Sequence, residues 1–303
     1  FFKLFFMQKK IFLSILISFV CCVSSFSQQK IKLWDENPTH KEKWSELTVF
    51  LPEKPDTSGI SVIICPGGSY IYLDMDNEGY TVAKYLNSKG ITVFVLHYRT
   101  AWQGNHHPAM IQDLQRAMQI VKENAQTYKI DPEKVGVMGF SAGGHLAGIS
   151  CLNYDFNDLC EKKNHKNQNN HAKIKVQTMR PYFAAMIYPV ITMTDENIVH
   201  KKSRKNLLGK KYTPEMAKKM SLEQNVRQDM PPIFLLHCTG DKTVDYRNSV
   251  VFNRALTEKN VKHKFLLLDE NGHGGHGFGI QPNGKATGWI DEFIDWIRLI
   301  NNE

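Results

Sequence analysis

Short apolar runs alternate with longer segments of helical periodicity along most of the 303-residue chain. Apolar runs, some of them continuous as in strands covered on both faces, predict strands over residues 47–51, 60–65, 91–97, 135–138, 183–190, 233–238 and 264–268. Apolar residues at three- and four-residue spacing predict helices over residues 79–88, 108–128, 248–258 and 286–299. This alternation predicts an α/β fold, with a mainly parallel central sheet and helices on both faces. In such sheets, reacting groups gather at the carboxyl ends of the strands.

The N-terminal segment has a different pattern. A short basic start precedes an apolar run over residues 11–23, and small residues follow up to Ser27. This pattern predicts a secretory signal peptide over residues 1–27, too short and wrongly flanked for a membrane span, with residues 1–6 upstream of the true start. We therefore expect a secreted or periplasmic protein. A lipid-anchored form is the less favoured alternative, because the residue before the paired cysteines of this run is not small.

The rest of the chain, residues 28–303, is long enough for one core and contains no linker or repeat, so we expect a single domain with a local insertion at residues 160–172. Removal of the leader takes away three lysines and no acid, which lowers the formal net charge from +8 to +5. Much of the basic excess lies in residues 162–175 and 201–219, without interleaved aromatic residues or a nucleic-acid motif. This favours a solvated basic face over an acidic-substrate patch, and we expect neither a nucleic-acid nor a membrane partner.

Four cysteines remain after the leader, which is too few for a disulfide scaffold. Cys65 and Cys238 end apolar strands and are expected to be small buried side chains. Cys151 and Cys160 are close enough in sequence for a disulfide in an oxidising compartment. No Cys-x-x-Cys pair occurs, and we expect neither a metal nor another cofactor.

The most informative motif is Gly-x-Ser-x-Gly at residues 139–143, between an apolar strand and a helix. A serine hydroxyl reacts as a nucleophile when it is held clear of the backbone, beside a base and near amide donors. A tight strand-to-helix turn meets these needs, and it requires glycine on both sides of the serine because a Cβ there would clash. We therefore predict Ser141 as the nucleophile, with Gly139 and Gly143 forming the turn around it.

A serine nucleophile needs a base and an acid that orients the base. Asp241 lies at the end of a predicted strand after a glycine and is favoured as the acid over Asp245. A glycine-rich loop after the last strand carries two candidate bases, His273 and His276. Two close histidines also suggest a metal site, but no third ligand accompanies them. His145 is expected to pack in the helix after the nucleophile.

The tetrahedral intermediate of ester hydrolysis needs amide donors for its oxyanion. One donor is expected from Ala142, which follows the nucleophile. The other is expected from the loop Pro66-Gly-Gly-Ser-Tyr, whose glycines allow the backbone to approach a substrate closely.

Several motifs extend this pattern over nearly all of the chain after the leader. They are Pro66-Gly-Gly-Ser-Tyr, His97-Tyr-Arg, the helix with Asp113, Arg116 and Ala117, Gly139-Phe-Ser-Ala-Gly-Gly-His-Leu-Ala, Tyr188-Pro-Val-Ile, residues 203–209, Pro231-Pro-Ile-Phe and His276-Gly-Phe-Gly. With them, the chain resembles the α/β-hydrolase esterases, and more narrowly a secreted acetylesterase branch related to acetyl xylan esterases. The segment of residues 203–209 is specific to that branch.

The resemblance implies the α/β-hydrolase fold and assigns the site. It implies Ser141, Asp241 and His276 as the catalytic residues, and the oxyanion amides as those of Gly68, Ser69 and Ala142. The chain departs from the branch at Asp245, where proline is frequent, and at Tyr182, where aspartate is frequent; neither position is a member of the triad.

We therefore expect a serine esterase that hydrolyses short-chain acetyl esters, with plant polysaccharides or oligosaccharides such as xylan as substrates. Alternatives are a general carboxylesterase or lipase-like enzyme, an arylformamidase-like amidase, a peptidase on the same fold, and a non-catalytic carbohydrate-binding protein. Tyr70 and Trp102 near strand ends are aromatic residues that either pack against sugar rings or serve as ordinary packing.

Overall fold

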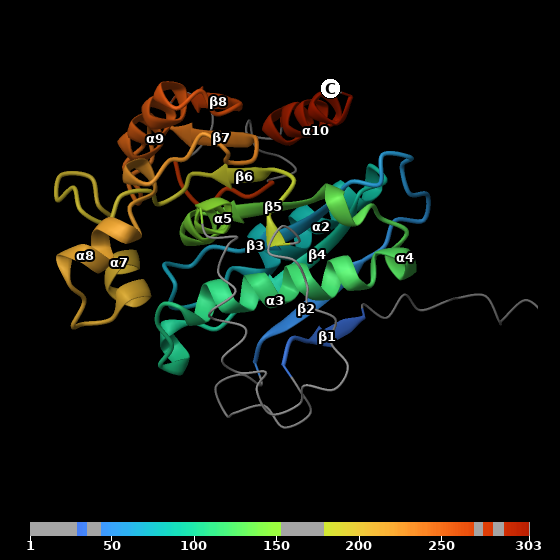
Figure 1. Ribbon diagram of the computed structural model, residues 1–303, viewed down its shortest axis with the longest axis horizontal. Helices are drawn as coiled ribbons and strands as arrows, with labels where there is room; N and C mark the ends of the chain where they lie inside the picture. Colours follow the sequence, from blue (N-terminus) through green and yellow to red (C-terminus); the bar gives the residue numbers. More distant parts are fainter. Residues whose placement is uncertain (1–28, 35–43, 153–178, 270–274, 281–287, 303) are drawn as a thin grey trace, which may run out of the picture.

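A mixed sheet of eight strands forms the frame of the protein in a computed structural model, which describes residues 29–34, 44–152, 179–269, 275–280 and 288–302 (Figure 1). The strands are β1 Lys30–Lys32, β2 Glu46–Phe50, β3 Ser61–Cys65, β4 Thr92–His97, β5 Val135–Phe140, β6 Ala184–Ile187, β7 Ile233–Cys238 and β8 His263–Leu268. Their order across the sheet is β1-β2-β4-β3-β5-β6-β7-β8. Strands β3 to β8 run parallel, and β1 and β2 add an antiparallel edge.

Helices cover both faces of this sheet (Figure 1). The α-helices are α2 Val82–Ser88, α3 Ala109–Glu123, α4 Ala125–Tyr128, α5 Ala142–Leu152, α7 Lys201–Leu208, α8 Pro214–Lys219, α9 Arg247–Glu258 and α10 Gly288–Asn301. A π-helical turn, η1 Met75–Thr81, leads into α2, and short 3₁₀ turns are η2 Ala101–Gln103, η3 Pro132–Lys134 and η5 Leu222–Gln224. The predicted α/β fold with a mainly parallel sheet is therefore confirmed.

Two hydrophobic cores, one on each face of the sheet, explain why the strand sequences are apolar throughout. Successive side chains of a strand point to opposite faces. In β5, Val137 belongs to the core that contains Leu146 of α5, whereas Met138 belongs to the core that contains Phe293 of α10. The first core also includes α3 and α9, and the second includes α2. The central strands are thus buried on both faces, as their continuous apolar runs predicted.

Two predicted boundaries are wrong, each for a local reason. The helix predicted over residues 108–128 is interrupted at Asn124, whose backbone leaves helical geometry and whose side chain donates to the carbonyl of Ile120 at 2.8 Å. The strand predicted over residues 183–190 ends at Ile187, because Tyr188 has a left-handed φ of 38°. Strand β1, residues 75–78 of η1 and helices α7 and α8 were not predicted from the sequence.

A buried ion pair fixes the loop after β4 to helix α3. Arg99 and Asp113 are both almost completely buried, and their charged groups are 2.8 Å apart. The Asp113 carboxylate also accepts hydrogen bonds from the Ser45 hydroxyl and the Trp34 indole, each at 2.8 Å. The carboxylate therefore holds together the antiparallel edge of the sheet, α3 and the loop that follows β4.

Cys65, Cys151 and Cys238 are free, buried thiols, which confirms the expectation for the two strand-end cysteines. Cys160, which the spacing allows as a disulfide partner of Cys151, lies outside the described residues, as do the predicted leader and the insertion at residues 160–172. Within the described part of the chain, no helix combines the length and apolarity required to cross a membrane.

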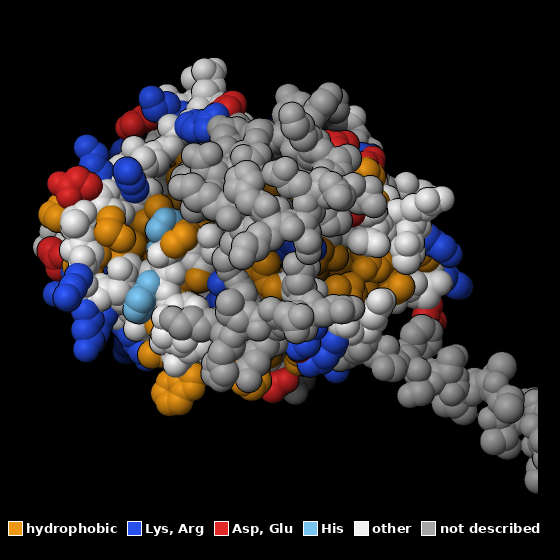
Figure 2. Space-filling model, turned by 60° about the horizontal axis from the view of Figure 1, so that its bottom comes forward, with side chains coloured by type: hydrophobic (Ala, Val, Ile, Leu, Met, Phe, Trp, Pro, Cys, Tyr) orange, Lys and Arg blue, Asp and Glu red, His pale blue; other side chains and the backbone are white. Residues whose placement is uncertain are grey.

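On the face shown in Figure 2, Lys and Arg side chains lie around the edge with Asp and Glu side chains among them. One of the two basic stretches contains α7, where Lys201 and Arg204 both pair with Glu196. Charges of both signs are thus mixed on this surface.

Candidate active site

The turn between β5 and α5 has the geometry that the Gly-x-Ser-x-Gly motif predicts. Ser141 has a left-handed φ of 53° and is almost completely buried. A Cβ on Gly139 would lie 2.0 Å from the carbonyl oxygen of Gly143, and a Cβ on Gly143 would lie 2.0 Å from that of Cys65. Glycine is therefore required at both positions, and the turn packs directly on the end of β3.

A chain of hydrogen bonds connects Ser141 to the ends of two further strands. The Ser141 hydroxyl lies 2.9 Å from Nε2 of His276, in the loop after β8. Nδ1 of His276 lies 2.7 Å from the Asp241 carboxylate, directly after β7. Because a carboxylate only accepts hydrogen bonds, Nδ1 carries the proton and Nε2 is free to accept the serine proton. The structure thus brings together Ser141, His276 and Asp241 in the geometry of a serine-esterase triad.

Asp241 is held as an ionised carboxylate by several donors. Its second oxygen accepts hydrogen bonds from the backbone amides of Thr243 and Val244 at 2.8 and 2.9 Å, and Nε2 of the buried His237 lies 3.2 Å from the first. Burial by itself raises the pKa of Asp241, but the hydrogen bonds from His237 and His276, the charge of His276 and the Val244 amide together lower it to about 2. The carboxylate therefore stays charged and orients the imidazole at any pH where an ester hydrolase works.

The competing acid and base lie elsewhere. Asp245 lies two residues before α9 and accepts hydrogen bonds from the Arg247 amide and guanidinium, both at 2.9 Å. It has no hydrogen bond to His276. His273 lies outside the described residues.

His145 is a fully buried part of the packing, as expected from the sequence. Its Nε2 donates to the carbonyl of Met220 at 2.7 Å, so Nδ1 accepts from the hydroxyl of Tyr70 at 2.8 Å. Burial lowers the pKa of His145 to about 4, which keeps this ring neutral. Tyr70 is itself fully buried. It is therefore a packing residue, and the sugar-contact alternative raised for it from the sequence is wrong.

The predicted oxyanion loop, residues 66–70, presents two amides. The direction of each follows from the hydrogen bond that the carbonyl of the same peptide unit accepts. The carbonyl of Gly67 accepts from the amide of Asp74 at 3.0 Å, and the carbonyl of Gly68 accepts from the amide of Ile71 at 3.0 Å. In a trans peptide the N–H points away from the carbonyl of the same unit. The amides of Gly68 and Ser69 therefore point out of the loop, and no acceptor among the described residues takes their hydrogen bonds.

The amide of Ala142 is oriented in the same way. The carbonyl of Ser141 accepts from the amide of Val190 at 3.1 Å, and the opposite end of that peptide unit is the Ala142 N–H. This amide also has no acceptor among the described residues. A Cβ on Gly67 would lie 2.9 Å from Cβ of Ser141, so the loop and the nucleophile are in contact.

Helix α7 supports the oxyanion loop. Ser69 and Tyr70 have left-handed φ values of 58° and 61°, which non-glycine residues seldom adopt. The side-chain amide of Asn206 donates to the carbonyl of Ser69 at 2.8 Å, and the hydroxyl of Tyr70 is held by His145. Asn206 lies in the segment of residues 203–209, so the motif that singled out a branch of esterases contributes directly to this loop.

A buried carboxylate connects the oxyanion loop to the histidine loop. Glu78 of η1 accepts hydrogen bonds from the Gly67 amide at 2.7 Å and the Tyr188 hydroxyl at 2.9 Å. The Tyr188 ring packs on His276, with centroids 4.7 Å apart, and its hydroxyl accepts from the Gly279 amide at 3.1 Å. Burial raises the pKa of Glu78 to about 7, against the hydrogen bonds from Tyr188 and Gly67, which lower it. The sequence did not identify this network, because nothing in the spacing marks Glu78 as a buried carboxylate.

No group of three or more His, Cys, Asp or Glu side chains in the described part of the chain is arranged to hold a metal ion. The hydrogen-bonded chain from Ser141 to Asp241 and the neighbouring amides support nucleophilic attack by a hydroxyl, assisted by an imidazole and by amide donors.

Comparison with known proteins agrees with this chemistry. The model of the BD-FAE family matches residues 47–256. The acetylxylan esterase of Xylanibacter ruminicola is 29% identical over 277 residues, which cover 90% of this chain and 51% of that protein. Endo-1,4-beta-xylanase B of Butyrivibrio fibrisolvens is 30% identical over 263 residues, covering 85% of this chain and 39% of that protein. The chain thus spans about half the length, or less, of these curated relatives.

Among solved structures, an acetyl ester-xyloside bifunctional hydrolase from Caldicellulosiruptor lactoaceticus is 29% identical, with a TM-score of 0.69 over 91% of this chain and 94% of that one. A thermophilic esterase from Thermogutta terrifontis shares the fold, with a TM-score of 0.67 at 17% identity, over 89% of this chain and 90% of that one. Because the family model matches more than half of its residues, the chain belongs to the BD-FAE family of α/β-hydrolase esterases.

Proposed function

We propose that this esterase removes acetyl groups from plant polysaccharides or their oligosaccharides, such as xylan, with Ser141, His276 and Asp241 as its catalytic triad. The observation that carries the reaction is the hydrogen-bonded chain from Ser141 to Asp241, beside amides that have no acceptor in the described part of the chain. The substrate class is supported by relatives named as an acetylxylan esterase, a xylanase and an acetyl ester-xyloside hydrolase.

The proposed reaction begins with attack of the Ser141 hydroxyl oxygen on the acetyl carbonyl. His276 accepts the hydroxyl proton at Nε2 as the new carbon–oxygen bond forms, and Asp241 stabilises the resulting imidazolium. The carbonyl oxygen becomes an oxyanion, which the amides of Gly68, Ser69 and Ala142 hold by hydrogen bonds. His276 then returns the proton to the sugar oxygen, so that the alcohol leaves and Ser141 carries the acetyl group.

The second half repeats the same proton transfers with water as the nucleophile. His276 takes a proton from water, which attacks the acetyl-serine carbonyl, and the same amides hold the second oxyanion. Collapse of this intermediate returns the proton to Ser141 and releases acetate. Each step uses only groups of the chain and water.

Substitution of the nucleophile tests the chemistry. Ser141→Ala is expected to lower kcat for 4-nitrophenyl acetate by roughly 10⁴-fold or more, since only oxyanion stabilisation and binding remain. Circular dichroism and thermal unfolding should match the wild type. Activity within about tenfold of the wild type, in a variant free of contaminating esterase, would show that Ser141 is not the nucleophile.

A matched pair of acids tests the triad assignment. Asp241→Asn should lower kcat by about 10⁴-fold, because the amide favours the wrong tautomer of His276. Asp245→Asn, at a half-buried residue four positions later and just before α9, should change kcat by less than about threefold. A larger loss in the second variant than in the first would reverse the assignment.

The substrate class is tested by acetate release from acetylated xylan, pectin and mannan, beside aryl esters of increasing chain length. Preference for acetyl over longer acyl groups, together with acetate release from a glycan, supports the proposal. A preference for octanoyl or longer esters with no acetate from any glycan would instead support a lipase-like carboxylesterase.

Secretion remains a prediction from the leader-like residues 1–27, which lie outside the described residues. Expression in a bacterial host, followed by N-terminal sequencing of the exported protein, tests it. Cleavage near Ser27 is the expected result, and retention of the intact leader in the cytoplasm would contradict it.

A further inference from the structure

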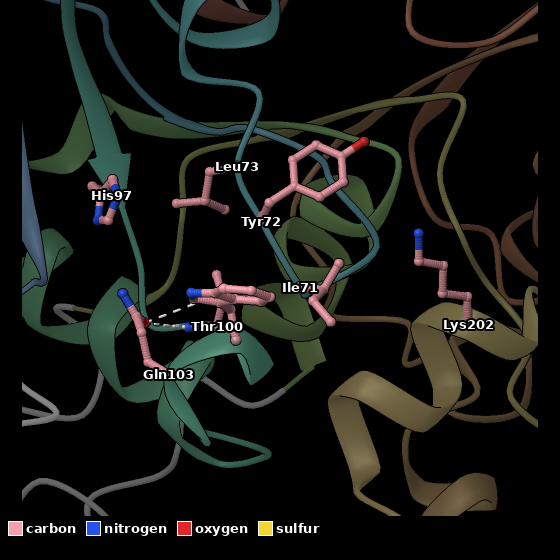
Figure 3. A pocket seen from close by; sticks show the side chains of 8 residues that line it. Ile71, Tyr72, Leu73, His97, Thr100, Gln103 and Lys202 are labelled. Carbon is pink, nitrogen blue, oxygen red and sulfur yellow. Dashed lines mark hydrogen bonds between the residues drawn. The ribbon is translucent and has the colours of Figure 1, made fainter.

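A pocket of about 510 Å³ opens beside the oxyanion loop, and no member of the triad lines it. Its walls come from residues 71–73, from the loop after β4 and from Lys202 of α7 (Figure 3). This volume lies within the range of roughly 300–1,000 Å³ that is usual for small-molecule sites. The pocket is therefore large enough to hold a part of the substrate other than the reacting ester.

The walls of this pocket also fix the oxyanion loop. The amide of Ile71 donates to the carbonyl of Gly68 at 3.0 Å, and the amide of Ala101, at the start of η2, donates to the carbonyl of Tyr70 at 2.8 Å. Helix α7, which holds the same loop through a side-chain amide, contributes Lys202. The pocket is thus directly connected to the loop whose amides are proposed to hold the ester.

Two exposed aromatic side chains line the pocket. Trp102 is 83% exposed and Tyr72 is 59% exposed, whereas most aromatic rings of the described chain are buried. Trp102 stands on η2, a turn closed by a hydrogen bond of 2.9 Å from the Thr100 amide to the side-chain oxygen of Gln103. An exposed indole on a rigid support offers contact area to a ligand at a low cost in conformational entropy.

Polar donors stand next to these rings. The side-chain nitrogen of Gln103 and the ammonium group of Lys202 have no hydrogen-bond partner among the described residues, and both line the pocket (Figure 3). A pyranose ring presents apolar C–H faces to an aromatic side chain and hydroxyl groups at its edge to such donors. A fatty acyl chain would cover the donors without replacing their bonds to water. The lining therefore favours a sugar over an acyl chain.

From this geometry, we propose that Tyr72 and Trp102 form a subsite for a sugar unit next to the acetylated unit of the substrate. The inference rests on the proposed glycan deacetylation and adds where the glycan lies. The two residues bind and position the substrate, and they take no part in the transfer of protons.

The test compares a long substrate with one too small to reach the subsite. Trp102→Ala and Tyr72→Ala should each raise KM for longer acetylated xylo-oligosaccharides by about tenfold. Both should leave kcat/KM for 4-nitrophenyl acetate within about twofold of the wild type. Trp102→Tyr should restore most of the lost affinity for the oligosaccharides. The control Leu299→Ala truncates an exposed side chain on α10 and should leave the kinetic constants for both substrates unchanged.

A binding measurement separates this proposal from the proposed function. Titration of unacetylated xylo-oligosaccharides into Ser141→Ala should show binding that Trp102→Ala in the same background abolishes, whether or not the wild type releases acetate from glycans. Unchanged binding would overturn the subsite. Equal losses of kcat/KM for long and small substrates would also overturn it, because they would show that the two aromatic residues only support the oxyanion loop. A loss confined to octanoyl esters would make the pocket an acyl site. Absence of acetate release by the wild type, with binding intact, would overturn only the proposed substrate.

Discussion

Two carboxylates, Asp113 and Glu78, are buried in different regions of the same molecule, and their partners differ. Asp113 faces the guanidinium of Arg99 and also accepts hydrogen bonds from two neutral side chains, so its charge is neutralised where it lies. Glu78 accepts one amide and one hydroxyl hydrogen bond, and no described residue forms an ion pair with it. The first region is a structural joint away from the triad, whereas the second lies between the oxyanion loop and the loop of His276.

This difference shows that burial alone does not define the role of a carboxylate. A neutralised carboxylate with several donors fixes the elements around it. A carboxylate without a cation keeps its proton to a higher pH, as the pKa of about 7 for Glu78 shows, with burial as the main cause. Substitutions at the two sites should therefore have different effects: at Asp113 on the stability of the fold, and at Glu78 on the pH dependence of that stability.

The largest effect in this comparison is expected for Asp113→Ala. It leaves the Arg99 guanidinium buried without its counter-charge, which typically costs about 3–5 kcal/mol of the free energy of unfolding. Urea unfolding followed by fluorescence measures this loss. The control Asp291→Ala removes an exposed partner of Lys89 and should cost less than about 1 kcal/mol. Equal, small losses in the two variants would show that the buried pair is not a structural joint.

The sequence predicted the triad region but not the ion pair between Arg99 and Asp113. The turn at Ser141 was readable because its glycines and its strand and helix are local in the chain. Asp241 and His276 were readable because parallel strands bring their carboxyl ends to one edge. The structure brings these three side chains together.

The contact between Glu78 and Tyr188 was not readable, because it joins residues 110 positions apart. Glu78 stands in no local motif, and the motif that begins at Tyr188 does not show which group its hydroxyl binds. A glutamate in an amphipathic segment is normally solvated, and only the π-helical turn η1 turns this one inward. Tyr70 and Trp102 illustrate the same limit. The sequence allowed sugar contact or ordinary packing for both, yet Tyr70 is fully buried and Trp102 is 83% exposed.

The second prediction concerns the pH dependence that Glu78 confers on stability. Its pKa is about 7 in the folded protein, against 4.5 as the ordinary value, so between these limits the folded state binds the proton and the unfolded state does not. The contribution of Glu78 to the free energy of unfolding therefore falls as pH rises through this window, by about 3 kcal/mol. Denaturant unfolding at pH 4.5 and pH 8 should show that the stability of Glu78→Gln, relative to the wild type, increases between the two pH values.

The control for this measurement is Glu292→Gln, an exposed carboxyl on α10 that pairs with Lys264. It should keep the pH dependence of the wild type. Identical pH dependences in the wild type and Glu78→Gln would mean that Glu78 ionises in the folded protein as it does in the unfolded chain.

The smallest effect is expected for Tyr188→Phe, which keeps the ring on His276 and removes the hydroxyl between Glu78 and the Gly279 amide. Two buried groups each lose one partner, so the free energy of unfolding should fall by about 1–2 kcal/mol. The loop of His276 loses an anchor while the triad keeps its side chains, so kcat for 4-nitrophenyl acetate should fall by roughly threefold to tenfold with KM little changed. Steady-state kinetics and urea unfolding measure both quantities.

Tyr182→Phe is the matched control, because its hydroxyl donates only to the carbonyl of Ile300, far from the triad in the sheet. It should leave kcat unchanged. The double variant Glu78→Gln with Tyr188→Phe then sharpens the comparison: if the two residues act through one hydrogen bond, their effects on kcat will be less than additive. Strict additivity would show that the Tyr188 hydroxyl and Glu78 support the site independently, and the carboxylate would then act on the oxyanion loop alone.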